Sequence, residues 1–225
     1  RDPADAEQLH RHNVVATRNA LAGLRQAGVR RVVVASTSGT IAVSSDASQI
    51  ADEESSAPMD LIARWPYYRS KLYGEREALG ANAPEFEVVI VNPSLLLGPG
   101  DLQGSSTIDV QRFLERAIPA VPAGGIAFVD ARDAATGMRL AFEHGRPGER
   151  YLLTAQNLTL AAFFQRLSRL TGVPAPRLPM PRSRPLALGL SKLFTQAVRA
   201  IGGEPPVDEV SVEMAQYFWY CSSDK

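Results

Sequence analysis

Hydrophobic and polar positions follow two different periods along this chain. Between residues 4 and 26, Val14, Val15, Leu21 and Leu24 recur near the 3.6-residue spacing of a helix, which predicts an amphipathic helix. Short continuous apolar runs are typical of parallel strands that are buried on both faces. Such runs occur at 32–36, 87–92, 124–130 and 150–155.

Helical patterns separate these apolar runs. Pro66 is well placed to begin a helix after a long polar loop at 36–65, because proline is tolerated in a first helical turn. Further helices are expected at 107–117, 131–145 and 158–172. Strands that alternate with helices predict an α/β fold with a doubly wound parallel sheet, Rossmann-like in its order. We expect residues 1–172 to form this domain, and the proline-rich and helical residues 173–225 to form a small cap on the C-terminal edge of the sheet.

Charge and cysteine content limit the classes of partner. Lys and Arg together number 24, as do Asp and Glu, so the net charge is zero. No basic surplus points to nucleic acid or to an anionic membrane, so neither is expected as a partner, although a local patch can hide in a neutral total. Cys221 is the single cysteine, which fits a reducing compartment and predicts a cytoplasmic protein. Neither a signal peptide nor a metal-ligand spacing is apparent.

Tyr67 and Lys71 are the first candidates for chemistry. They are four positions apart on the helix expected after Pro66, so both lie on one helical face. A phenol has a pKa of roughly 10, and a nearby ammonium lowers that pKa toward the range useful for proton transfer. Tyr68 has Leu72 four positions later and is better explained as a packing residue.

Hydroxyl side chains follow the first predicted strand. Ser36, Thr37 and Ser38 stand where that strand ends, and open α/β folds bind ligands at the carboxyl ends of their strands. A Ser/Thr cluster is also a common way to begin a loop. The tyrosine helix some thirty residues later favours the functional interpretation.

Six segments occur in a recognisable order, namely "NVVATRNAL", "GVRRVVVASTSGT", "YYRSK", "NPSLLLGPGD", "FVDARDAA" and "GERYLL". Together they resemble the extended short-chain dehydrogenase/reductase family, of the NAD-dependent epimerase/dehydratase type, and especially its dihydroflavonol reductase-like and hopanoid-associated sugar epimerase-like members. The resemblance extends from residue 1 to about residue 171. It implies that residues 1–172 are the C-terminal portion of a Rossmann-like NAD(P)-binding domain with interleaved substrate-binding segments, and that residues 173–225 form a small substrate-binding part.

The resemblance implies a role for each matched residue. Tyr67 would be the general acid/base, and Lys71 would lower its pKa and bind the ribose of NAD or NADP. Ser38 would hydrogen-bond the substrate oxygen, with Thr37 as the alternative, and Asn13 would support the site. The residues that would contact the cofactor, besides Lys71, are Ser36, Thr37, Tyr67, Pro93, Ser94 and Leu95. Ser105 and Ser106 are weaker candidates for contact with cofactor or substrate. Family members often form homodimers, so a homodimer is an expected assembly.

The chain departs from the family pattern at its glycine-rich turn. That turn, which lets a diphosphate approach a helix N-terminus, is absent, and we expect it to belong to an upstream segment outside this sequence. The resemblance implies an NAD(P)-dependent oxidoreductase that acts on a small-molecule ketone, aldehyde or secondary alcohol. A nucleotide-sugar epimerase or dehydratase is the alternative, but Ile126 stands where those enzymes usually have an arginine. A non-catalytic sensor or scaffold is the third hypothesis. Asp130 or Asp133 is expected to cap a helix.

Overall fold

The computed structural model describes residues 3–102, 104, 106–200, 202 and 208–225. Its first helical unit matches the helix expected at 4–26. It consists of α1 (Pro3–His10), a π-helical turn η1 (Arg11–Val15) and α2 (Ala16–Gln26). Val14 and Leu21 are buried along this unit and Val15 is half-buried, whereas Leu24 is 39% exposed, so the predicted apolar face points inward except at its C-terminal end.

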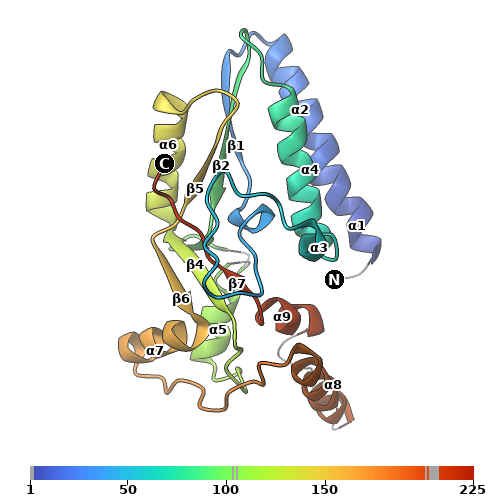
Figure 1. The fold of residues 1–225 in the computed structure, drawn as a ribbon, viewed down its shortest axis with the longest axis vertical. Helices are drawn as coiled ribbons and strands as arrows, with labels where there is room; N and C mark the ends of the chain where they lie inside the picture. Colours follow the sequence, from blue (N-terminus) through green and yellow to red (C-terminus); the bar gives the residue numbers. More distant parts are fainter. Residues whose placement is uncertain (1–2, 103, 105, 201, 203–207) are drawn as a thin grey trace.

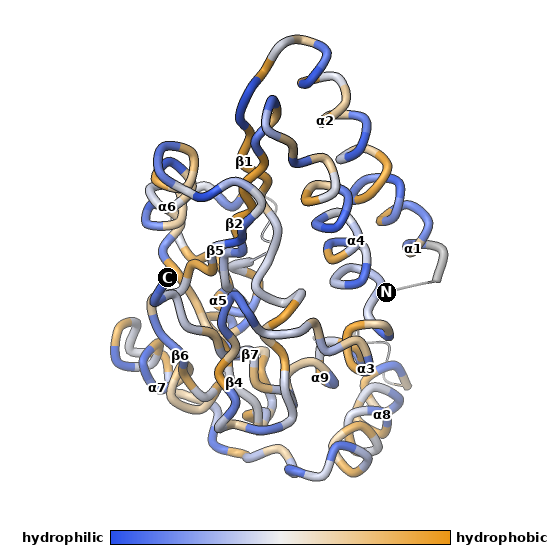
Figure 2. Tube along the Cα trace, turned by 45° about the horizontal axis from the view of Figure 1, so that its top comes forward, coloured by the Kyte–Doolittle hydropathy of each residue, from blue (hydrophilic) through white to orange (hydrophobic). Residues whose placement is uncertain are grey.

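The central sheet contains three parallel strands in the order β1 (Arg31–Ala35), β2 (Glu87–Pro93) and β5 (Arg150–Leu153). Helices α2 and α4 (Pro66–Gly80) lie on one face and α6 (Ala131–His144) lies on the other (Figure 1). The four residues 88–91 of β2 are fully buried, which explains their continuous apolar run. Figure 2 shows the same layering as hydrophobic strands between helices with hydrophilic outer turns. The predicted α/β class is confirmed.

A second sheet contains the strand expected at 124–130. This strand, β4 (Gly125–Asp130), pairs in parallel with β3 (Leu95–Leu97) and β7 (Phe218–Trp219), and antiparallel with β6 (Gln156–Thr159). The expectation of one sheet with only parallel strands was therefore incomplete. Only Ser94 separates β2 from β3, and a parallel neighbour in the same sheet needs a crossover of a dozen or more residues. The chain must consequently leave the first sheet at this point.

Shorter elements occupy segments expected to be loops. The loop at 36–65 contains the 3-10 turn η2 (Ser38–Thr40) and helix α3 (Met59–Ile62). The other helices agree with the sequence pattern, namely α5 (Ile108–Leu114), α7 (Leu160–Thr171), α8 (Arg184–Ala200) and α9 (Glu209–Met214). Among the described residues, no helix combines the length and the apolarity that crossing a membrane requires.

Candidate active site

Helix α4 carries both residues of the tyrosine–lysine pair. It begins at Pro66, and Tyr67 lies in its first turn with 39% of its surface exposed. Lys71 lies one turn later, and its Nζ donates a hydrogen bond to the carbonyl oxygen of Ala35 at 2.8 Å. Burial lowers the pKa of the Lys71 ammonium, while the nearby Glu75 carboxylate raises it. The lysine is thus fixed beside the carboxyl end of β1. Open α/β folds bind their ligands at this edge of the sheet.

The hydroxyl segment after β1 packs against the first turn of α4. Thr37 caps η2 by accepting a hydrogen bond from the Gly39 backbone N–H at 3.3 Å. A Cβ atom added to Gly39 would lie 2.2 Å from Cε1 of Tyr68, so the glycine permits a close approach between the two segments. Ser38, the second predicted catalytic residue, is buried in this same turn.

Asn13 is connected to the turn that carries Tyr67. Its side-chain amide donates to the Ser70 hydroxyl at 3.0 Å, and that hydroxyl donates to the Tyr67 carbonyl oxygen at 2.8 Å. Asn13 lies within the π-helical turn η1, and such turns occur frequently at functional sites. The contact gives Asn13 a positioning connection to Tyr67 through one intervening residue.

Glu75 is a residue of this region that the sequence analysis missed. Its carboxylate is 1% exposed, and its Oε1 accepts hydrogen bonds from Ser36, Thr40 and Asn92 at 2.5, 2.7 and 2.7 Å. Its Oε2 lies 3.5 Å from Nη1 of Arg150. One carboxylate therefore joins α4 to the ends of β1 and β2 and to β5. The signal in the sequence was its position four residues after Lys71.

The segment 93–95, which is expected to contact the cofactor, lies at the carboxyl end of β2. Pro93 and Ser94 are buried, and Leu95 is half-buried. The Ser94 backbone N–H and hydroxyl both donate to the carbonyl oxygen of Leu153, at 2.9 and 3.0 Å. Ser105 lies outside the described residues. The Ser106 N–H donates to Asp101 at 2.9 Å, which gives it a structural role in that loop.

The residues that follow the Ser38 turn pack against the C-terminal segment, because Ile41 and Ala42 share a core cluster with Cys221. The Cys221 thiol is fully buried. Burial raises its pKa to about 11, while interactions with the Thr154 and Ser38 hydroxyls act in the opposite direction. Asn157 fixes the backbone of Cys221 through two hydrogen bonds, at 2.9 and 3.1 Å. The residues at the very end of the described chain thus support the loop that carries Ser38.

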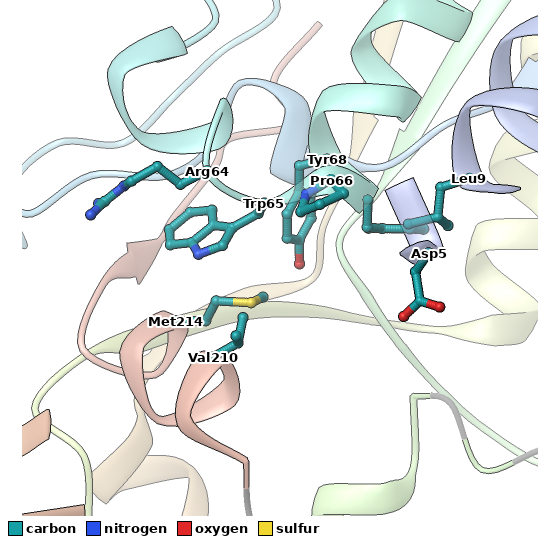
Figure 3. Close-up of a pocket in the computed structure, with 9 residues that line it drawn as sticks. Asp5, Leu9, Arg64, Trp65, Pro66, Tyr68, Val210 and Met214 are labelled. Carbon is teal, nitrogen blue, oxygen red and sulfur yellow. The ribbon is translucent and has the colours of Figure 1, made fainter. Parts of the chain in front are cut away.

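Tyr67 and its neighbour Tyr68 border a small pocket of about 50 Å³. Figure 3 shows the Trp65 and Tyr68 rings above Val210 and Met214 of α9, with Asp5 and Leu9 of α1 beside them. A volume of this size is far below the 300–1,000 Å³ typical of ligand pockets. The pocket is therefore too small to be the cofactor cleft.

Asp130 has the structural role that the sequence predicts. It is the N-cap of α6, and its carboxylate accepts from the Arg132 N–H at 2.8 Å. Hydrogen bonds from Arg132 lower the pKa of the Asp130 carboxyl to about 2. This carboxylate is engaged in helix capping.

The fold is that of an α/β protein whose candidate site residues lie at the carboxyl ends of parallel strands. The model of the "NAD dependent epimerase/dehydratase family" matches residues 1–153, and the chain belongs to that family. It is 36% identical, in an alignment that covers 97% of its length, to the "Putative dihydroflavonol 4-reductase" of a Synechocystis strain. It spans 64% of that relative and about half of the next two curated relatives that it matches.

Solved structures agree with this assignment. The crystal structure of gox2253 matches the whole chain with a TM-score of 0.78 and 29% identity, over 67% of its own length. DesIV of Streptomyces venezuelae, a dTDP-glucose 4,6-dehydratase solved with NAD bound, matches 78% of the chain with a TM-score of 0.63 and 24% identity, over 55% of its own length. The second likeness concerns the fold alone.

NAD is the cofactor of the family, and the described residues fit its nicotinamide end. An ammonium has three N–H donors, and the bond to Ala35 engages one of them, so donors remain for ribose hydroxyls. The lysine also lies at the carboxyl edge of the sheet, where dinucleotides bind in such folds.

Among the residues described, no group of three or more His, Cys, Asp or Glu could hold a metal ion.

Proposed function

We propose that the protein is an NAD(P)-dependent oxidoreductase that interconverts a ketone or aldehyde and the corresponding alcohol. The observation that carries this proposal is the position of Lys71, hydrogen-bonded to the last residue of β1 and one helical turn after Tyr67. The similarity to a protein named as a reductase supports carbonyl chemistry. The fixed connection from Asn13 through Ser70 to the Tyr67 turn supports a positioned phenol.

Each residue has a separate task in the proposed reaction. Lys71 would hold the ribose of the reduced cofactor, which would supply a hydride for the carbonyl carbon and leave as oxidised NAD(P)+. Tyr67 Oη gives its proton to the carbonyl oxygen, and the Lys71 ammonium stabilises the phenolate that remains. The Ser38 hydroxyl donates a hydrogen bond to the same oxygen and orients it. In the oxidation direction Tyr67 accepts the proton from the alcohol.

The alternative is a nucleotide-sugar epimerase or dehydratase, which would use the same residues with transient oxidation. The family description includes both reactions. Ile126 on β4 weighs against it, because an apolar side chain at that position provides no clamp for a diphosphate. A non-catalytic sensor is the third hypothesis, and such a protein has no need of all three chemical residues, whereas this chain retains Ser38, Tyr67 and Lys71.

Turnover of NADH or NADPH with a panel of ketones and aldehydes tests the proposal. Tyr67→Phe should lower kcat by at least about 100-fold, the usual contribution of a general acid, while cofactor affinity stays nearly unchanged. Lys71→Met should weaken cofactor binding as well, and Tyr68→Phe serves as the matched control with near-normal turnover. Normal turnover in Tyr67→Phe would contradict the mechanism. Activity with dTDP- or UDP-sugars alone would favour the epimerase/dehydratase alternative.

A further inference from the structure

The charges of this neutral chain are strongly segregated along the sequence. Residues 150–203 contain eight Lys or Arg and no Asp or Glu, so the rest of the chain carries the compensating acidic excess. Most of these basic residues lie within residues 160–200, which include α7, the proline-rich linker and α8. We call this segment the basic end. Its exposed members are Arg166, Arg169, Arg177, Arg182, Lys192 and Arg199.

The basic end forms one extremity of the molecule. Figures 1 and 2 both show α7, the linker and α8 in sequence along the same end, opposite the turn that joins α2 to β1. The segments that carry the exposed basic residues therefore lie at one end of the molecule. The adjoining helices α5 and α9 carry four exposed acidic residues, Asp109, Glu115, Asp208 and Glu209, against six exposed basic ones in the basic end. The excess of basic residues favours a local positive potential that the net charge of zero conceals.

Helix α8 adds an apolar stripe to this positive surface. Ala187 is buried, and Lys192 pairs with Glu209 of α9 at 3.7 Å, so one side of α8 is held against the protein. A different side is apolar and open to solvent. Its members follow at intervals of four, three and one positions, and they are Leu186, Leu190, Leu193 and Phe194, exposed by 54, 48, 63 and 43%.

More apolar side chains are exposed on the same end. Leu170 at the end of α7 and Leu178 in the linker are 77 and 68% exposed. Apolar residues scattered singly on a surface need no explanation, but a stripe on one helical face with two leucines from adjoining segments is a patch. A partner of this surface must therefore carry negative charge and must also be able to bury leucine and phenylalanine side chains.

We propose that the basic end is a docking surface for an anionic phospholipid bilayer, with α8 lying in the plane of the headgroups. Its leucine and phenylalanine stripe would enter the acyl boundary, and the exposed arginines of the basic end would meet the lipid phosphates. Nucleic acid would match the charge and leave the stripe in water. An acidic protein groove would match both, so the experiment must distinguish it. The proposal departs from the expectation of no membrane partner, which rested on the total charge.

Sedimentation with vesicles tests the proposal directly. The purified protein should bind vesicles of phosphatidylglycerol and phosphatidylcholine at low salt, bind pure phosphatidylcholine vesicles weakly, and dissociate in about 0.5 M KCl, where the Debye length is only a few ångströms. Absence of binding to the phosphatidylglycerol vesicles at low salt would overturn the proposal.

Two double variants separate the two contributions. Leu193→Gln with Phe194→Gln should lower the partition coefficient by at least about tenfold, because apolar burial is lost. Arg177→Gln with Arg182→Gln should lower it by about 25-fold at low salt, since each basic residue near an anionic surface contributes about fivefold. Normal far-UV circular dichroism confirms that each variant is folded, which the exposure of all four side chains predicts.

Matched controls come from the other parts of the molecule. Leu140 and Phe142 on α6 are exposed by 43 and 50%, so Leu140→Gln with Phe142→Gln removes similar apolar surface elsewhere. Arg30→Gln with Arg76→Gln removes two exposed charges outside the basic end. Both controls should bind vesicles like the unmodified protein. Equal losses in the controls, or self-association that Leu193→Gln with Phe194→Gln abolishes in the absence of lipid, would refute a bilayer surface.

Discussion

At the scale of single residues, Glu75 determines how the site is held together. Its carboxylate is buried among three hydrogen-bond donors and faces Arg150. Replacing one carboxylate oxygen with an amide brings two N–H donors into a cluster that already consists of donors. A buried polar group that loses its partner costs far more than an exposed one.

Glu75→Gln is therefore expected to reduce the free energy of unfolding by about 3 kcal/mol, the cost of breaking a buried ion pair. Glu77, two positions later on α4, is the matched control, because it pairs with Arg18 near solvent at 2.7 Å. Glu77→Gln should cost less than about 1 kcal/mol, as exposed ion pairs do. Urea unfolding curves of the two variants make the comparison. Equal losses would show that the buried network contributes nothing beyond a surface pair.

The sequence revealed the chemical residues of this region but not their support. Tyr67 and Lys71 were recognisable because a helical spacing of four relates them directly. Glu75 has the same spacing from Lys71, yet an acidic residue on a helix is usually solvated, and nothing local indicated burial. Its donors Ser36, Thr40 and Asn92 come from other segments, and only the folded chain brings them together.

At the scale of elements, the close packing of the first helical unit on α4 fixes Asn13. A Cβ atom added to Gly74 would lie 2.2 Å from the backbone oxygen of Asn13. That oxygen also accepts a hydrogen bond from the Thr17 hydroxyl at 2.9 Å. The contact involves backbone, which cannot rotate away as a flexible side chain can, so any larger residue must separate the two helices.

Gly74→Ala should destabilise the protein by about 2 kcal/mol, within the range for overpacking, even though alanine favours helices. Gly80, at the end of the same helix, has no atom within 4 Å of the added Cβ position. Gly80→Ala should therefore be neutral or stabilising by up to about 1 kcal/mol. Thermal unfolding of both variants measures the difference. A neutral Gly74→Ala would mean that the helices do not approach this closely.

Long elements were predictable and short ones were not. The helix expected at 4–26 is present. Its π-helical turn was not visible in the sequence pattern, because a single residue inserted into a helix leaves most of the apolar spacing unchanged. Strands β3 and β7 have only three and two residues, too few for a period to be visible. β3 lies within a glycine- and proline-rich stretch that resembles a loop.

At the scale of the whole molecule, the C-terminal segment joins the two sheets. Phe218 pairs with Gly125 of β4 and forms a bridge with Ser44, while Cys221 forms a bridge with Ala51. Lys225 pairs with Glu149, next to β5, at 2.6 Å. The sequence could not indicate this division into two sheets, because the pairing of residue 125 with residue 218 depends on contacts far apart in the chain.

The single thiol reports whether this segment stays in place. Cys221 is fully buried with a pKa of about 11, so at pH 8 only about one molecule in 1,000 carries a thiolate, against about one in four for an exposed cysteine. We expect the native protein to react with a disulfide reagent such as DTNB at least about 100-fold more slowly than the chain in urea. Asn157→Ala, which removes two hydrogen bonds to the Cys221 backbone, should raise the native rate by about tenfold. A native rate close to that of the unfolded chain would mean that the segment detaches while the sheets remain folded, and that Ser38 is positioned without its help.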